Sequence, residues 1–225
     1  MAVHLPKPQQ GSADYSAKFT VPAFGLLEKS TALSKEFFAA LHLYGARLED
    51  LRIEGQNTGN VTLALHSFTP SNFIARLRLD SLQITFHSLE TIGPENAKQL
   101  VLDCWRAIHE IDNSVEPERH TIITAYQFAV STGDYKTILS NFTKMPKGLP
   151  AGAHGAVAFY LPGGSEIGDV GGAIVLDRMT NGELNLRITM NVDGKATPTS
   201  ELSGYVETYI NKILSALDIE VEVNS

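Results

Sequence analysis

The chain has 225 residues, of which 43% are hydrophobic and 19% are charged. This composition is typical of a globular protein and supplies a sizeable core for one large domain or two small ones. The formal net charge of −7 argues against general binding to nucleic acids or anionic membranes, because both need a basic surface.

The single cysteine, Cys104, excludes an internal disulfide, so nothing in the sequence requires an oxidising compartment. The N-terminal residues contain no apolar core of signal-peptide length. No apolar run approaches the roughly 18 residues of a membrane span. We therefore expect a cytoplasmic protein that binds neither nucleic acid nor membrane.

The first elements follow from proline content and periodicity. Residues 1–18 are rich in proline, glutamine and glycine near their middle and predict a flexible N-terminal tail. A short edge strand is expected over residues 19–27. Residues 31–44 predict an amphipathic helix, because apolar side chains recur on one helical face and Gly45 follows as a stop.

Two strands, 47–54 and 60–68, are expected next, joined by a loop rich in turn-forming residues. The alternating segment 72–89 predicts a long strand whose phase slips near Asp80 and Ser81, which indicates a β-bulge. A helix over residues 94–111 begins with a proline suited to its first turn. Its predicted buried stripe comprises Ala97, Leu100, Val101, Cys104, Ile108 and Ile111.

The polar connection 113–119 is the predicted boundary between two halves. The elements expected after it are a strand (121–130), a short helix beginning near Asp134, strands 156–161 and 173–179, a strand over 182–193 and a helix over 198–217. The strand over 182–193 has the clearest pattern, because Leu184, Leu186, Ile188, Met190 and Val192 alternate with polar residues.

Both halves, 19–112 and 120–225, therefore follow the order β-α-β-β-β-α. We predict an α+β fold of two such repeats, with a mainly antiparallel sheet and helices packed on one face. The two halves are expected to form one compact unit.

The glycine-rich segment 162–172 resembles neither a phosphate loop nor a nucleophile elbow. It contains no lysine, it is followed by a predicted strand, and Glu166 and Asp169 would repel a phosphate. The G-x-S-x-G pattern fails at Ile167. We interpret the segment as a hairpin loop.

None of the seven histidines has the spacing of a metal site. His109 and Asp112 lie three residues apart at a helix end, and His120 follows in a position to join them. The preferred interpretation is a surface helix end where His109 lies near the negative pole of the helix dipole. Cys104, beside Ile108 on the apolar stripe, is expected to be an inert core thiol. Trp105 lies just off that stripe, and two interpretations remain open for it: packing at the edge of the core or part of a partner surface.

The polar faces of the long strands supply the candidate ligand or partner surface, which comprises Arg76, Arg78, His87 and Arg187. Ordinary solvation explains such faces in most antiparallel sheets. The alternative is a sheet surface on which the arginines anchor an anionic group.

Because paired acid/base, metal and nucleophile signatures are lacking, we expect a non-catalytic binding or protein-interaction module, with no cofactor, no metal and no catalytic residue. Its partner would be a protein or a small ligand. The alternative is a hydrolase whose site combines a carboxylate with His109, His120 or His154, brought together only by folding. A homodimer is a third interpretation, since dimers are the commonest closed oligomers.

Overall fold

The computed structural model describes residues 3–54, 62–67, 73–142, 155–164, 171–178 and 182–222. The chain divides into two compact units, and each is described by itself. Unit 1 comprises residues 1–11, 123–190 and 204–225, and unit 2 comprises residues 12–122 and 191–203. Three strands, β2, β7 and β10, contribute residues to both units.

Unit 2 is built on antiparallel strands. Its elements are β2 (Gln10–Phe19), α1 (Phe24–Glu28), α2 (Ser30–His42), the 3-10 turn η1 (Leu48–Asp50), β3 (Leu51–Glu54), β4 (Thr62–Ser67), β5 (Phe73–Arg78), β6 (Ser81–Phe86), α3 (Leu89–Ile92), α4 (Pro94–Ile111), the start of β7 (Pro117–Phe128) and the 3-10 turn η2 (Thr199–Glu201). The hydrogen-bonded strand order is β3-β4-β5-β6-β2-β7. Each pair from β3 to β2 is antiparallel.

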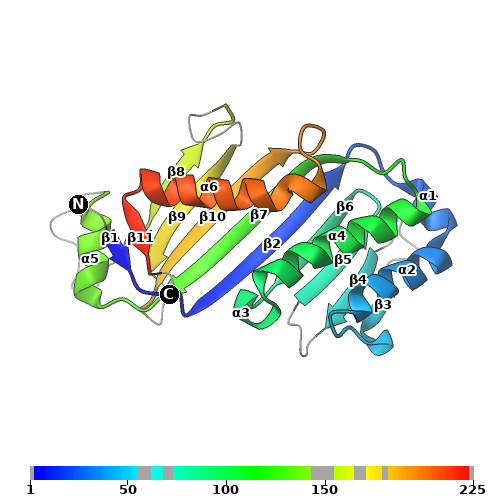
Figure 1. Ribbon diagram of the computed structural model, residues 1–225, viewed down its shortest axis with the longest axis horizontal. Coiled ribbons are helices and arrows are strands. Elements are labelled where there is room, and N and C mark those ends of the chain that lie inside the picture. Colours follow the sequence, from blue (N-terminus) through cyan, green and yellow to red (C-terminus); the bar gives the residue numbers. More distant parts are fainter. Residues whose placement is uncertain are drawn as a thin grey trace. The chain divides into compact units, whose positions relative to one another are not determined.

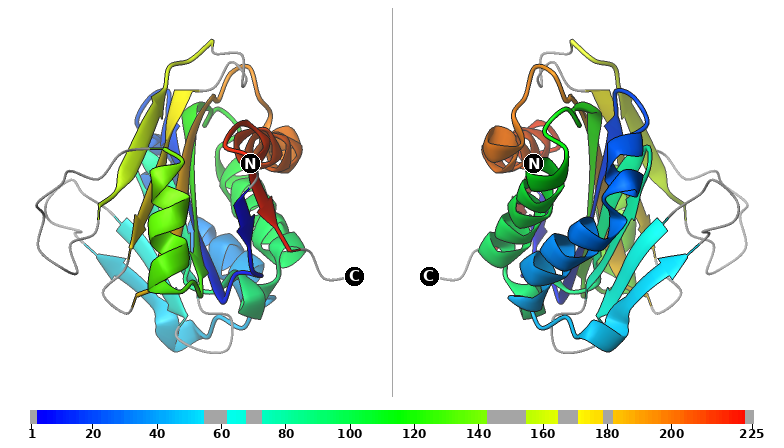
Figure 2. Two further views of the ribbon diagram at one scale, coloured as in Figure 1. Left: turned by 90° about the vertical axis from the view of Figure 1, so that its left-hand side faces the viewer. Right: turned by 90° about the vertical axis from the view of Figure 1, so that its right-hand side faces the viewer.

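Helices α2 and α4 lie along one face of these strands (Figures 1 and 2). The covered face of β2 presents Tyr15, Ala17 and Phe19, all buried, because alternate side chains of a strand point to the same side. The helices bury Leu33, Phe37, Leu41, Leu100, Cys104, Trp105 and Ile108 against this face. A two-layer core results.

Unit 1 is built on the strand order β7-β10-β9-β8. Its elements are β1 (Val3–Leu5), the remainder of β7, α5 (Thr132–Ser140), β8 (Val157–Leu161), β9 (Gly171–Arg178), β10 (Leu184–Asp193), α6 (Leu202–Ala216) and β11 (Ile219–Val221). Strands β1 and β11 form a separate parallel pair that joins residues near the two ends of the chain. Helix α6 runs along the sheet strands of this unit (Figure 1).

The α+β class and the predominance of antiparallel pairing are confirmed, whereas the architecture of two equal repeats is not. The second half does run β7-α5-β8-β9-β10-α6. The first half contains an additional strand, because the segment predicted as one long strand forms two strands, β5 and β6.

The predicted β-bulge at Asp80 and Ser81 is therefore wrong. Leu77 pairs with Leu82, so the chain reverses through Leu79 and Asp80 instead of continuing forward. A tight reversal and an inserted residue both shift the phase of an alternating pattern, and hydrophobicity alone does not distinguish them.

The prediction of a flexible tail over residues 1–18 is also wrong, because the segment contains β1 and most of β2. The sequence signal for β2 is the alternation of Tyr15, Ala17 and Phe19. It was overlooked because the alternation begins within a polar segment. Likewise, the connection 113–119 does not separate the units, since β7 begins at Pro117 and has residues in both units.

Strand β10 confirms the alternation predicted for residues 182–193. Leu184, Leu186, Ile188, Met190 and Val192 are buried. Asn185 was expected on the solvent-facing side but is also buried, where its side-chain amide donates a hydrogen bond of 2.8 Å to the Asp177 carboxylate. Among the described helices, none combines the length and the hydropathy that a membrane span requires.

We predict that Gly172→Ala destabilises the protein by about 2–3 kcal/mol, the usual range for overpacking a core. A β-carbon at Gly172 would clash with the Thr189 carbonyl oxygen and would lie 2.7 Å from the Tyr209 hydroxyl. The free energy of unfolding in urea measures the effect.

The matched control is Gly204→Ala on α6 of the same unit. The site is exposed and has no atoms near the new methyl group, so this variant should gain about 0.5–1 kcal/mol from helix propensity. Equal stability of the two variants would contradict the close packing of α6 against β9.

Candidate functional site

A cavity of about 690 Å³ lies beside the second half of α4 in unit 2. Its apolar wall is formed by Leu102, Trp105, Val115, Pro117 and Pro198. Polar groups complete the lining: Arg106, His109, Glu110, Asn113, Glu116, Thr199 and Ser200. The cavity therefore combines an aromatic wall with a polar margin that carries both signs of charge, and we call it the Trp105 cavity.

Trp105 is held in a fixed orientation by the core of unit 2. Its indole Nε1–H donates a hydrogen bond of 2.7 Å to the Tyr15 hydroxyl. The ring also meets Phe19 edge-on, with centroids 5.7 Å apart, and lies 5.4 Å from the ring of His109. Only 3% of Trp105 is exposed, so the indole forms the inner wall of the cavity and does not project into solvent.

The Tyr15 hydroxyl continues this hydrogen-bond chain to His120. Because the indole can only donate, the Tyr15 oxygen accepts from Trp105 and its own proton is directed to His120 Nδ1, at 3.0 Å. His120 is therefore a neutral imidazole with its proton on Nε2. Among the described residues, this buried Nε2–H has no hydrogen-bond partner of normal geometry.

Burial is the main cause of the pKa shifts of His120 and Tyr15. Desolvation lowers the pKa of His120 below its ordinary 6.5, and the nearby Thr197 backbone offsets part of that shift by favouring the protonated ring. Burial also raises the pKa of the Tyr15 phenol. Both groups consequently stay neutral at physiological pH.

His109 also lies beside Trp105, at the cavity lining. Its Nε2 is 3.0 Å from the Val115 carbonyl oxygen, to which it donates. This bond ties the end of α4 to the segment that leads into β7. The imidazole is thus fixed by the backbone, and its Nδ1 is the nitrogen left for other interactions.

The loop after β10 completes the cavity. Gly194 donates a backbone hydrogen bond of 3.1 Å to the Glu118 carbonyl oxygen. A β-carbon at Gly194 would clash with the Pro117 carbonyl and would lie 2.9 Å from the Pro117 side chain. Glycine is therefore required for the loop to approach the start of β7 this closely, which places Pro198 and Ser200 at the cavity.

A buried carboxylate orients the arginine at the cavity margin. Asp103 is 4% exposed and accepts hydrogen bonds from the Tyr44 hydroxyl at 2.7 Å and from Gln99 at 3.1 Å. Arg106 lies 2.8 Å from the same carboxylate. The Asp103 contacts join the end of α2 to α4 and hold the guanidinium in place.

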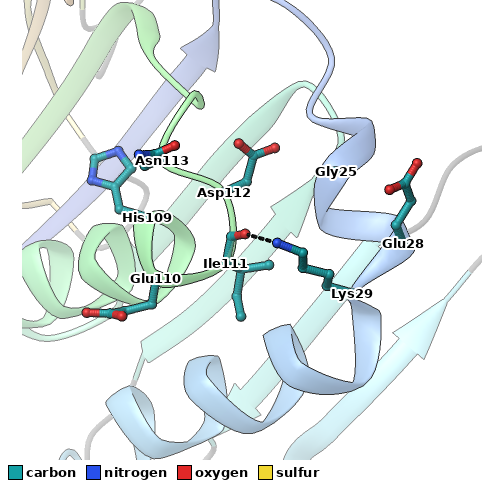
Figure 3. A pocket seen from close by; sticks show the side chains of 8 residues that line it. All are labelled: Gly25, Glu28, Lys29, His109, Glu110, Ile111, Asp112 and Asn113. Atoms are coloured by element: carbon teal, nitrogen blue, oxygen red, sulfur yellow. Dashed lines mark hydrogen bonds between the residues drawn. The ribbon is translucent and has the colours of Figure 1, made fainter.

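A second, smaller hollow of about 420 Å³ lies at the C-terminal end of α4 (Figure 3). Lys29 donates a hydrogen bond of 3.0 Å to the Ile111 carbonyl, which complements the negative end of the helix. Asp112 accepts from the amide and hydroxyl of Ser114, and these bonds lower the pKa of its carboxyl group. The polar groups of this smaller hollow thus cap the end of α4, whereas the Trp105 cavity has an apolar wall.

The sequence-predicted surface is divided between the units. Arg76, Arg78 and His87 belong to unit 2, and Arg187 belongs to unit 1. Arg78, His87 and Arg187 are exposed, and Arg76 is half-buried opposite Gln83 of β6. None of the four lines the Trp105 cavity.

The predicted grouping of His109, Asp112 and His120 is only partly realised. The two histidines flank Trp105, with ring centroids 5.4 Å and 6.4 Å from the indole. Asp112 instead lines the smaller hollow. His154 and residues 165–170 of the glycine-rich segment lie outside the described residues.

Cys104 is fully buried, and burial raises the pKa of its thiol, as expected for a core thiol. Within the part of the chain that the structure describes, no three His, Cys, Asp or Glu side chains group as metal ligands. Sequence reasoning did not find Tyr15, Pro117 or Pro198, whose importance depends on contacts between distant segments. No protein-family model matches the chain, and no curated protein matches it in sequence.

We predict that unit 2 loses stability as the pH falls below about 6.5, the ordinary pKa of histidine. The unfolded chain then binds a proton that the buried imidazole resists, so the free energy of unfolding decreases by up to about 1.4 kcal/mol per pH unit. Above that pH the contribution of His120 is constant.

Urea unfolding between pH 7.5 and 5.5 measures this slope. His120→Gln is the matched variant, because its amide oxygen can accept from Tyr15 but the side chain does not titrate. The variant should show a shallower slope over this range. Identical slopes for the two proteins would refute the assignment of a neutral, buried His120.

Proposed function

We propose that the protein is a non-catalytic binding module and that the Trp105 cavity is its ligand site. The favoured ligand is a small organic molecule with a planar apolar group that lies against the wall of Trp105, Val115 and Pro117. The observation that carries this proposal is the combination of cavity volume, aromatic wall and polar margin in one unit.

The volume supports a small ligand. Cavities that hold small molecules commonly measure about 300–1,000 Å³ and combine apolar walls with a few placed polar groups. The Trp105 cavity, at about 690 Å³, falls in this range. Its margin offers Arg106 for an acceptor group and Glu110 or Glu116 for a donor group.

The engagement of the reactive side chains supports binding over hydrolysis. His109 Nε2 donates to the Val115 backbone carbonyl, and His120 Nδ1 accepts a hydrogen bond from the Tyr15 hydroxyl. His109 Nδ1 remains at the cavity for a substrate, but a hydrolytic base commonly also has a second group, often a carboxylate, that orients it. Among the described residues at this cavity, neither histidine is hydrogen-bonded to a carboxylate.

We also propose that the two halves derive from one duplicated unit. The support is topological: the first long strand of each half is adjacent to the last strand of that half, β2 to β6 and β7 to β10. Each last strand is followed by a long helix, α4 or α6. Superposition of the two halves in an experimental structure would test this, and unmatched strand directions would refute it.

Trp105 is the only tryptophan in the chain, so its fluorescence reports directly on the cavity. We predict that fragments drawn from a library of aromatic acids, aromatic amines and neutral rings will include some that change its emission saturably. Ser200→Phe should weaken such binding at least tenfold, because the new ring occupies space at the cavity lining. A tenfold loss corresponds to about 1.4 kcal/mol.

Thr208→Phe on the exposed surface of α6 is the matched control and should bind as the wild type does. Ligand-observed NMR on the same fragments provides an independent reading of affinity. The proposal fails if no fragment class changes the emission of Trp105, or if Ser200→Phe and Thr208→Phe bind equally well.

A further inference from the structure

Strand β8 is an uncharged edge strand in unit 1. Its five residues, Val157 to Leu161, are all apolar or aromatic, and three of them (Val157, Phe159 and Tyr160) favour extended structure. It stands last in the strand order, and β9 is its one strand neighbour among the described residues. Natural edge strands usually carry a charge, a proline or a bulge that discourages pairing with another chain, and this strand has no charge and no proline.

The two sides of β8 differ sharply in exposure. Val157 and Phe159 pair with Leu176 and Ile174, which are buried, so this side faces the core of unit 1. Ala158 and Tyr160 point to the opposite side and are exposed, Tyr160 by 81%. Single exposed aromatic rings are common on protein surfaces, so the significance of Tyr160 depends on whether its neighbours form a contiguous apolar patch.

The neighbouring strand extends the apolar character of this side. Ala158 pairs with Val175 and Tyr160 pairs with Ala173, so four apolar side chains adjoin one another. In unit 2 the corresponding side of the sheet carries polar pairs, such as Lys18 with Glu118 and Asp14 with Thr85. The absence of charge on β8 and its pairing partners in β9 is therefore a local feature and not a general property of the chain.

We propose that β8 is a self-association strand, through which two copies of this chain pair antiparallel about a two-fold axis at Phe159. In this register Val157 of each copy faces Leu161 of the other, and Phe159 faces Phe159. Ala158 of each copy lies beside Tyr160 of the other on the exposed side. A large side chain thus meets a small one at both symmetry-related positions.

The strand selects a second copy because it is complementary to itself. A closed two-fold pairing uses the same surface on both subunits and leaves no further β8 edge free, so association stops at a dimer. The backbone groups on the outer edge of each β8, which no described strand pairs, gain partners, and the Tyr160 ring is covered by the partner's strand. Each chain carries a net charge of −7, and an uncharged strand is where two such chains meet with least repulsion.

Analytical ultracentrifugation of the full chain tests the proposal, with twice the chain mass expected at micromolar concentrations. Ala158→Lys and Tyr160→Lys each place two like charges diagonally across the two-fold axis on the exposed apolar side and should raise the dimer dissociation constant at least tenfold each. Thr208→Lys on α6 adds the same charge to an exposed site away from β8 and should leave the dimer intact. Circular dichroism confirms that the variants are folded.

Cysteine cross-linking tests the register. Residues directly opposite on antiparallel strands have Cα atoms about 4.5–5.5 Å apart, within disulfide range. A mixture of Ala158→Cys and Tyr160→Cys proteins should therefore oxidise mainly to the mixed dimer. The buried native Cys104 should not take part.

A monomer at all concentrations would overturn the proposal, as would a dimer that both lysine variants leave unchanged. Preferential cross-linking of each cysteine variant to itself would overturn the register. None of these outcomes bears on ligand binding at the Trp105 cavity, because β8 belongs to the other unit.

Discussion

The hydroxyl group of Tyr15 is the constraint on which unit 2 depends. It accepts the indole proton of Trp105 and donates to His120, and all three side chains are at least 95% buried. A buried polar group that loses its partner costs about 1–3 kcal/mol. The hydrogen-bonded series Trp105–Tyr15–His120 is therefore stable only when all three side chains are in place. One atom of β2 thereby fixes a side chain of α4 against a side chain of β7.

The cavity follows from that constraint. Because Trp105 is held from behind, its ring forms a wall that does not collapse into the space in front of it. Gly194 lets the loop after β10 approach Pro117, which sets the opposite side of the cavity. Asp103 orients Arg106 at the margin and joins α2 to α4. The hydrogen bonds and close contacts described for unit 2 thus keep the Trp105 cavity open. In unit 1, by contrast, Tyr209 packs closely against Gly172.

The elements predicted best from the sequence are those that bury the same side from one end to the other. Helix α4 and strand β10 keep one buried side throughout, so their periodicity is unbroken. Strand β2 was overlooked because its pattern is short and lies in a polar segment after two prolines. The reversal at Leu79 and Asp80 was mistaken for a bulge because both change the phase in the same way.

The candidate site was beyond prediction for a related reason. Trp105 and His109 were visible as neighbours on one helix, but Tyr15, Pro117 and Pro198 reach them from segments far apart in the chain. A hydrophobic pattern indicates which side of an element is buried, but it does not identify the residues that pack against that side. The arginines chosen from the sequence were conspicuous as charges, yet Arg187 lies in a different unit from Arg76 and Arg78.

A double-mutant cycle on Tyr15 and His120 tests the central claim most directly. Tyr15→Phe, His120→Phe and the double variant would be compared with the wild type by urea unfolding, followed by far-ultraviolet circular dichroism. If the Tyr15 hydroxyl holds the two rings as one unit, the two changes will be coupled by at least about 1 kcal/mol, well above the 0.3–0.5 kcal/mol scatter of independent sites. Additive losses within that scatter would contradict the account.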